Sequence, residues 1–210
     1  MIEYWKKNIL ESWHIFSRNY ILLITPCILL LLIFYYVGLS INDTSISTPK
    51  LILILALSMI GVGVHMGAIS ITHSAIMGKK ITFIDIFQKF HLLHLILIPQ
   101  IVMFVVLFIL LNILPISAYA FILIAVILYF LFLFFYDYLI IIENLSMKEA
   151  LIKNYRLISN YPILILQFLL ISFLIGFCLT ILQLIGTILS MCFVRIAGIK
   201  LFLMLSNQSK

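Results

Sequence analysis

The sequence has little charge, few turn-forming residues and few cysteines. Only 10% of its 210 residues are charged, whereas 65% are hydrophobic; an ordinary soluble domain is about 25% charged and about 45–50% apolar. A soluble chain of this length has no interior large enough to bury so much apolar surface, so the bilayer must act as its solvent. The polar remainder is too short for a soluble catalytic, nucleotide-binding or receptor domain.

The three cysteines, Cys27, Cys178 and Cys192, lie in apolar runs and form no C-x-x-C motif. An odd number without paired spacing indicates neither a disulfide framework nor a cysteine zinc site, and we interpret them as small buried hydrophobes. The net charge of +6 is not accompanied by a basic surface interleaved with aromatic residues. We therefore expect no nucleic-acid binding.

The apolar residues fall into runs of the length that a transmembrane helix needs, about 20 residues. Four runs are separate, and the last 44-residue stretch divides near Gln183–Gly186. The predicted spans cover 21–39, 51–77, 92–111, 118–142, 162 to about 182, and about 187–205. We predict an all-α, polytopic membrane helical bundle with six spans, forming a single integral membrane domain over residues 1–210.

The basic residues orient this bundle through the positive-inside rule. With the N-terminus inside, Lys50 is the only basic residue in an outer loop, and Arg195 and Lys200 fall within the last span. Ten basic residues are then cytoplasmic: Lys6, Lys7, Arg18, Lys79, Lys80, Lys89, Lys148, Lys153, Arg156 and Lys210. We therefore expect a multi-pass protein of the cell membrane with both termini in the cytoplasm.

An amphipathic cytoplasmic segment precedes each pair of spans. The first is predicted as an interfacial helix with aromatic and charged residues on opposite faces. Its aromatic and apolar face holds Trp5, Ile9, Trp13, Phe16 and Tyr20, and its charged face holds Glu3, Lys7, Glu11, His14 and Arg18. In the second segment Thr82 and Asp85 resemble a capping box, with Asp85 and Lys89 spaced as an i,i+4 pair.

The third segment contains a complete capping box, Ser146 with Glu149. Its two predicted faces hold Met147, Leu151, Tyr155 and Ile158, and Glu149, Lys153, Arg156 and Asn160. The three segments suggest a helix-plus-hairpin repeat over 1–77, 78–142 and 143–210, and Phe16–Leu22 and Leu157–Ile163 share Asn-Tyr at the membrane boundary. An interfacial helix before any span would look similar, so both explanations stay open.

Two groups of residues in the cytosolic segments resemble a known family pattern. Gly78, Thr82, Asp85 and Phe87 follow G-x-x-(T/S)-x-x-(D/E)-x-F with one additional residue after the glycine, and the second group matches I-x-E-x-x-S-x-x-E-A-L. Its residues are Ile141, Glu143, Ser146, Glu149, Ala150 and Leu151. The chain thus resembles uncharacterised prokaryotic six-span proteins, which are similar to the membrane domain of glycerophosphodiester phosphodiesterases. Asn154 departs from the serine that is common there. The resemblance implies a membrane module without catalytic residues.

Ionisable residues at membrane depth are the default functional candidates. Asp137 lies about six residues from the cytoplasmic boundary of the fourth span, and Arg195 lies near the middle of the sixth. Because both spans run from outside to inside, we predict a buried Asp137–Arg195 ion pair. It would serve either as a gate or anion-binding site, or as a structural pair that sets helix packing, which is the interpretation we favour.

The second span carries a stripe of small residues, Gly63, Gly67, Ser70 and Ser74. Such a stripe lets a neighbouring backbone approach closely, so we predict a packing role. Near the cytoplasmic ends of the second and third spans lie His73, His91 and His94. Three imidazoles could bind zinc, although histidine also suits a membrane interface, and we prefer the second interpretation.

No motif for hydrolytic or covalent chemistry occurs, such as H-E-x-x-H, G-x-S-x-G or a P-loop. We therefore expect a protein without catalytic residues or cofactors: an accessory, scaffold or lipid-interacting module. Its basic amphipathic segments would contact membrane lipids, anionic ones on the cytoplasmic face. The alternatives are a small transporter or channel component, and a metal-dependent membrane hydrolase. A homo-oligomer or a second membrane protein stays open as partner.

Overall fold

The computed structural model describes residues 2–41, 48–113, 133–180 and 182–208, and every regular element in these ranges is helical. In chain order they are α1 (Ile2–Ile41), α2 (Thr48–Ile76), the 3₁₀ turns η1 (Phe83–Ile86) and η2 (Phe90–Leu92), α3 (Leu93–Ile113), α5 (Tyr136–Glu143), α6 (Met147–Asn160), α7 (Pro162–Thr180) and α8 (Gln183–Gln208). The predicted all-α class is confirmed for this part of the chain.

Five helical stretches are long and apolar enough to cross a membrane. They are Trp5–Leu39, Ile52–Ile76, Phe83–Met103, Pro162–Leu179 and Gln183–Gln208. They overlap the first, second, third, fifth and sixth predicted spans, which supports a multi-pass membrane protein. Most of the fourth predicted span, 118–142, lies outside the described residues, and its end forms α5.

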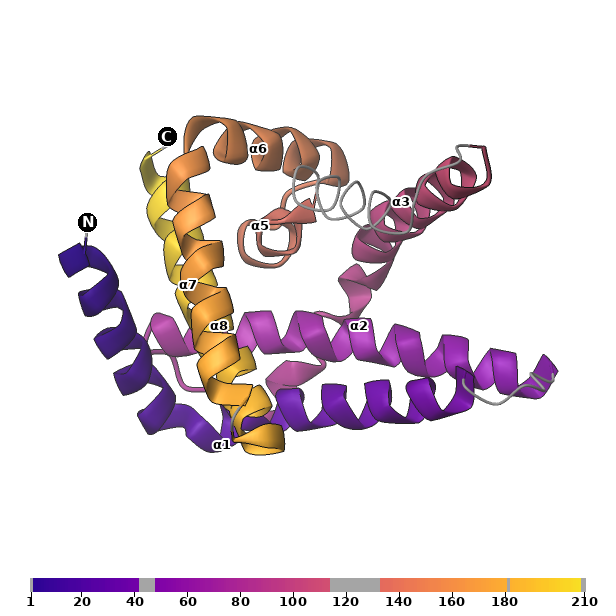
Figure 1. Cartoon of the computed structure of the whole chain (residues 1–210), viewed down its shortest axis with the longest axis horizontal. Helices are drawn as coiled ribbons and strands as arrows, with labels where there is room; N and C mark the ends of the chain where they lie inside the picture. Colours follow the sequence, from indigo (N-terminus) through magenta and orange to yellow (C-terminus); the bar gives the residue numbers. More distant parts are fainter. Residues whose placement is uncertain (1, 42–47, 114–132, 181, 209–210) are drawn as a thin grey trace.

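The long helices form two pairs. Figure 1 shows the later part of α1 and α2 side by side across the view, whereas α7 and α8 run up and down it. Helix α8 contacts both α1 and α2, and so joins the two pairs. The short helix α5 packs against α2, α3 and α6. The arrangement therefore departs from a simple parallel array of six rods.

The first predicted amphipathic helix is continuous with the first span and bends at Asn19, whose backbone is non-helical (φ −128°, ψ 20°). The bend turns the first half of α1 onto α8, where Trp13 stacks on Phe193 with ring centroids 5.6 Å apart. Its buried positions are Trp5, Asn8, Ser12 and Phe16. The predicted aromatic face is thus only half right, because protein covers one side of it and Trp13 and Tyr20 stay exposed.

The second predicted amphipathic helix is instead two 3₁₀ turns. The Thr82 amide donates to Asp85 Oδ2 at 2.7 Å, so the predicted capping contact forms, but it begins η1 rather than an α-helix. The predicted Asp85–Lys89 pair is replaced, because Asp85 accepts from Gln88 and Lys89 Nζ donates to Asn144 Oδ1 at 3.3 Å. The segment packs on α2 with Ile86 fully buried.

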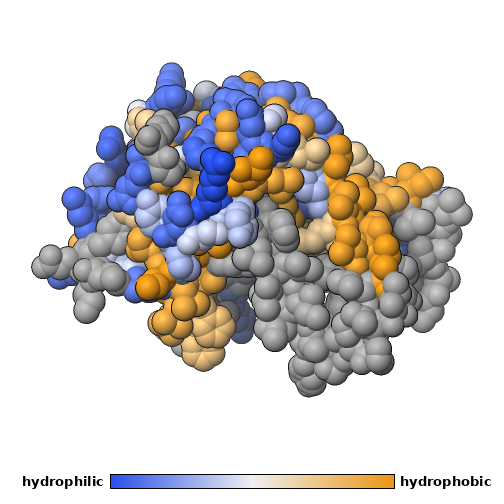
Figure 2. Space-filling view, turned by 90° about the horizontal axis from the view of Figure 1, so that it is seen from above, coloured by the Kyte–Doolittle hydropathy of each residue, from blue (hydrophilic) through white to orange (hydrophobic). Residues whose placement is uncertain are grey.

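The third predicted amphipathic helix is confirmed as α6, which begins with the Ser146–Glu149 capping box. Its buried positions are Ala150, Asn154, Leu157 and Ile158. Tyr155, which the sequence pattern placed with the apolar face, is exposed. Seen from above, on the side where α6 lies in Figure 1, hydrophilic residues gather over one part of the face and apolar residues lie beside and among them (Figure 2).

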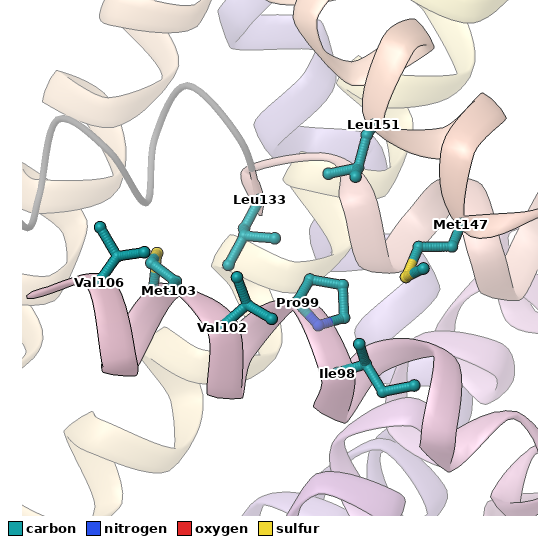
Figure 3. Close-up of a pocket in the computed structure, with 8 residues that line it drawn as sticks. All are labelled: Ile98, Pro99, Val102, Met103, Val106, Leu133, Met147 and Leu151. Atoms are coloured by element: carbon teal, nitrogen blue, oxygen red, sulfur yellow. The ribbon is translucent and has the colours of Figure 1, made fainter.

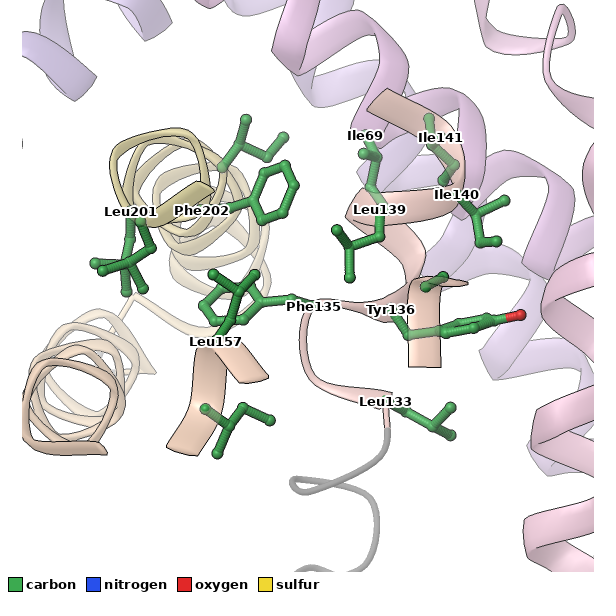
Figure 4. Close-up of a cluster of buried hydrophobic side chains, with 14 of the residues drawn as sticks. Ile69, Leu133, Phe135, Tyr136, Leu139, Ile140, Ile141, Leu157, Leu201 and Phe202 are labelled. Carbon is green, nitrogen blue, oxygen red and sulfur yellow. The ribbon is translucent and has the colours of Figure 1, made fainter. Parts of the chain in front are cut away.

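The main core forms where α5 is enclosed by α2, α6 and α8 (Figure 4). Phe135 and Tyr136 are fully buried, and the Phe135 ring lies 5.8 Å from that of Phe202. Burying an aromatic side chain of this kind contributes about 1.5–3 kcal/mol. This core holds the start of α5, and hence Asp137, against α2.

Candidate functional site

Asp137 of α5 pairs with His65 of α2. Its Oδ2 lies 3.4 Å from Nε2 of His65 in α2, and the Asp137 side chain is 13% exposed whereas that of His65 is 41% exposed. The carboxylate is therefore the enclosed member of the pair, and the imidazole faces open space.

Two hydrogen bonds made by the residues directly before Asp137 fix its position. The Phe135 amide donates to Asn154 Oδ1 of α6 at 2.8 Å, and the Tyr136 hydroxyl donates to the Leu95 carbonyl of α3 at 2.7 Å. Both anchors lie directly before Asp137 in the chain. They attach the first turn of α5 to two other helices, and this fixes where the carboxylate points.

Arg195 in α8 is buried, with only 8% exposure, and its Nη1 lies 3.4 Å from Sγ of Cys27 in α1. The predicted Asp137–Arg195 pair is not among the ion pairs of the described residues, since Asp137 pairs with His65. The physical reason is packing: Asp137 contacts α2 from α5, whereas Arg195 points from α8 toward α1.

A cavity of about 330 Å³ opens beside His65, between α1, α2, α3 and α8. Three polar side chains line it, Ser58, His65 and Gln100, and the other lining residues are apolar or glycine. Ser58 Oγ is already used, because it donates to the Ile54 carbonyl at 2.8 Å. His65 is thus the ionisable group of this cavity, with Asp137 behind it.

The small-residue stripe is where the η1–η2 segment approaches α2. A Cβ on Gly63 would overlap the Phe90 ring, and one on Gly67 would overlap the Ile86 carbonyl. The partner is therefore a pair of 3₁₀ turns rather than a neighbouring α-helix. Ser70 and Ser74 continue the stripe toward the end of α2 at Ile76.

The three histidines that we considered as possible zinc ligands do not form a metal-binding group in the described part of the chain. His73 lies in α2, His91 in η2 and His94 in α3, and no group of three His, Cys, Asp or Glu side chains in the described ranges is arranged to hold a metal. His91 Nδ1 instead lies 2.9 Å from the Gln88 carbonyl. The two 3₁₀ turns direct this segment along α2, so the assumed helical spacing does not apply.

A polar cluster that sequence reasoning missed joins α5, α6 and α8. Lys153 Nζ lies 3.0 and 2.7 Å from the two carboxylate oxygens of Glu143, and 2.9 Å from Ser206 Oγ. Ser206 also donates to Glu143. The charges of Lys153 and Glu143 compensate each other, and the hydrogen bonds among the three side chains join α5, α6 and α8.

The outer face of α6 combines cations with apolar groups. Lys148, Ile152, Tyr155 and Arg156 recur at i, i+4, i+7 and i+8, which is one stripe of a helix, and all four are exposed. Among the described residues, the side chains of Arg156 and Lys148 make no hydrogen bond or ion pair within the chain. This stripe can meet a surface that offers both apolar and anionic groups.

An apolar pocket of about 440 Å³ lies between α3 and α6 (Figure 3). Five side chains of α3 face Leu133, Met147 and Leu151 across it. No charged side chain lines the pocket. It can accept hydrocarbon but offers no group that would orient a polar ligand.

The chain matches no protein-family model, no curated protein and no solved structure.

Proposed function

We propose that the protein is a non-catalytic, multi-pass module of the cell membrane whose α6 face binds anionic lipid headgroups. The observation that carries this proposal is the exposed stripe of Lys148, Ile152, Tyr155 and Arg156. Apolar and aromatic side chains insert at a membrane interface while cations attract anionic headgroups, at about 1 kcal/mol per Lys or Arg near the surface.

The proposal includes six spans, cytoplasmic termini and kinship with the uncharacterised six-span proteins described above. Five apolar helices and the uneven distribution of basic residues among the segments between the predicted spans support it. A repeat is supported by one detail: the backbone leaves the helix at Asn19 and again at Tyr161, at neighbouring positions of the two Asn-Tyr segments. Each of these breaks separates an amphipathic helix from an apolar one.

Lipid selectivity tests the proposal in the full chain. The protein is reconstituted in phosphatidylcholine, and electron paramagnetic resonance compares the association of spin-labelled phosphatidylglycerol and phosphatidylcholine. We expect a preference for phosphatidylglycerol that falls at least threefold in K148Q/R156Q and weakens at 0.5 M salt. The charge-conserving K148R/R156K variant should keep it. An unchanged preference in K148Q/R156Q contradicts the proposal.

Topology is tested by single cysteines in a chain without native cysteines. Cysteines at positions 45, 117 and 184 should label from outside, and those at 80, 148 and 209 should be protected. Position 184 is chosen because Leu184 is 65% exposed, whereas a Cβ on nearby Gly186 would overlap the Leu179 carbonyl. Labelling of position 209 from outside would refute six spans with internal termini.

A small transporter or channel component is the second candidate function, favoured by the cavity beside the His65–Asp137 pair. An imidazole–carboxylate pair facing a cavity at membrane depth is suited to carry a proton. Proton flux into vesicles loaded with a pH-sensitive dye tests this role. Flux should be lost in H65Q and D137N but kept in H94Q, because His94 does not line the cavity. An equal proton flux in dye-loaded vesicles without protein would contradict the transport function.

A further inference from the structure

Two cysteines that lie 165 positions apart meet in the interior. Sγ of Cys27 in α1 is 3.4 Å from Sγ of Cys192 in α8. Both residues are buried, with 0% and 2% exposure, within a cluster that includes Leu23, Ile71 and Ile196. The contact lies where α1, after its bend, crosses α8.

The surroundings of this pair favour thiol chemistry over simple packing. Arg195 Nη1 lies 3.4 Å from Cys27 Sγ, and a cation beside a thiol stabilises the thiolate, which is the reactive form. Cys192 Sγ donates to the Leu23 carbonyl at 3.4 Å. Among the described residues, Arg195 forms no ion pair, so its charge is not neutralised by a carboxylate.

We propose that Cys27 and Cys192 are a reversible dithiol–disulfide pair, and that oxidation locks α1 onto α8. Two S–H bonds break and one S–S bond forms; the two electrons and two protons pass to a membrane-permeant two-electron oxidant of the azo class, which becomes a hydrazine. A disulfide requires about 2.05 Å between the sulfurs, so side-chain rotation must close the remaining gap. The proposal is independent of the lipid-binding function.

Cys178 provides an internal reference. It lies in α7 and is exposed, and it has no thiol partner in the described part of the chain. Oxidation within the native protein should therefore remove two thiols of three, and the surviving thiol should be that of Cys178.

The test treats the purified full chain in lipid nanodiscs with diamide, an azo oxidant that crosses membranes. After denaturation, free thiols are alkylated, and the protein is digested and analysed by mass spectrometry. We expect a peptide pair linked through Cys27 and Cys192, at least tenfold less alkylation of both, and full recovery after dithiothreitol. In C27S and C192S the remaining buried thiol should stay alkylatable.

Two results would overturn the proposal. One is full alkylation of Cys27 and Cys192 after diamide treatment that oxidises a small dithiol control. The other is loss of the Cys192 thiol to the same extent in C27S, which would show over-oxidation or cross-linking between chains. Because the first result is obtained on the wild-type chain, it does not depend on the folding of a variant.

Discussion

Gly67 in the middle of α2 packs directly against the backbone of Ile86 in η1, so closely that a Cβ on the glycine would overlap the Ile86 carbonyl oxygen. Ile86 is fully buried there, among residues of α1, α2 and α8. A 3₁₀ turn thus lies against α2, a helix long and apolar enough to cross a membrane, well inside its ends. Within a membrane, backbone that departs from the α-helix is tolerated only where protein or a water-filled cavity covers it.

This contact predicts that Gly67→Ala is destabilising. The added methyl group meets backbone, which cannot rotate away, so we expect a loss of about 1–3 kcal/mol. Gly61→Ala on the same helix is the control, because its Cβ would lie 3.5 Å from Ile33 Cγ2, an ordinary contact. Thermal unfolding followed with a maleimide dye that reacts with exposed thiols compares the two. Equal unfolding temperatures would refute the close packing.

The capping box of α6 predicts a pH effect. Hydrogen bonds from the Ser146 hydroxyl and amide lower the pKa of Glu149. Because the pKa of the folded state is lowered, this stabilisation is present above about pH 4.5 and is lost as the pH falls through the lowered pKa. Ser146→Ala should raise the pKa of Glu149 and fray the first turn of α6. Carbon-13 NMR of labelled glutamate in the full chain measures both; an unchanged pKa would show that the box does not form.

The cluster of Glu143, Lys153 and Ser206 predicts that one lysine of α6 matters for stability and another does not. Lys153→Met removes the charged donor from the Glu143 carboxylate and leaves the Ser206 hydroxyl as its donor. We expect a loss of about 1–2 kcal/mol in the free energy of unfolding, since both charged side chains are partly exposed. Lys148→Met, on the outer face of α6, should change the free energy of unfolding by less than about 0.5 kcal/mol. Chemical denaturation in mild detergent distinguishes them. A stable K153M would mean that water replaces the lysine at no cost.

Replacing Arg195 should affect stability in the opposite direction to replacing Lys153. Its guanidinium is buried without a carboxylate among the described residues, and keeping a charge there costs desolvation free energy. Replacing such charges by apolar residues of similar size is often neutral or stabilising, so Arg195→Met should leave the unfolding temperature unchanged or raise it. Arg156→Met, at an exposed position, should have no effect. A marked loss of stability in R195M would instead assign the guanidinium a structural role.

Local sequence patterns predicted the helical class, the long apolar helices and the Ser146–Glu149 cap, because each depends on residues within a few turns of one another. The same reasoning failed for the segment around Phe83, where a valid capping contact starts a 3₁₀ turn. Docking on Gly63 and Gly67 outweighs local helix preference there. In the same way, protein rather than lipid covers one side of the first half of α1.

The sequence by itself determined the five helices that are long and apolar enough to cross a membrane, because an apolar content of 65% is concentrated in runs of about 20 residues. It also determined which polar residues lie within apolar segments. Only the tertiary structure decided their partners: His65 for Asp137, and Cys27 for both Arg195 and Cys192. These contacts join helices far apart in the chain, and their geometry depends on the bend at Asn19 and the crossing of α1 and α8, which no local spacing encodes.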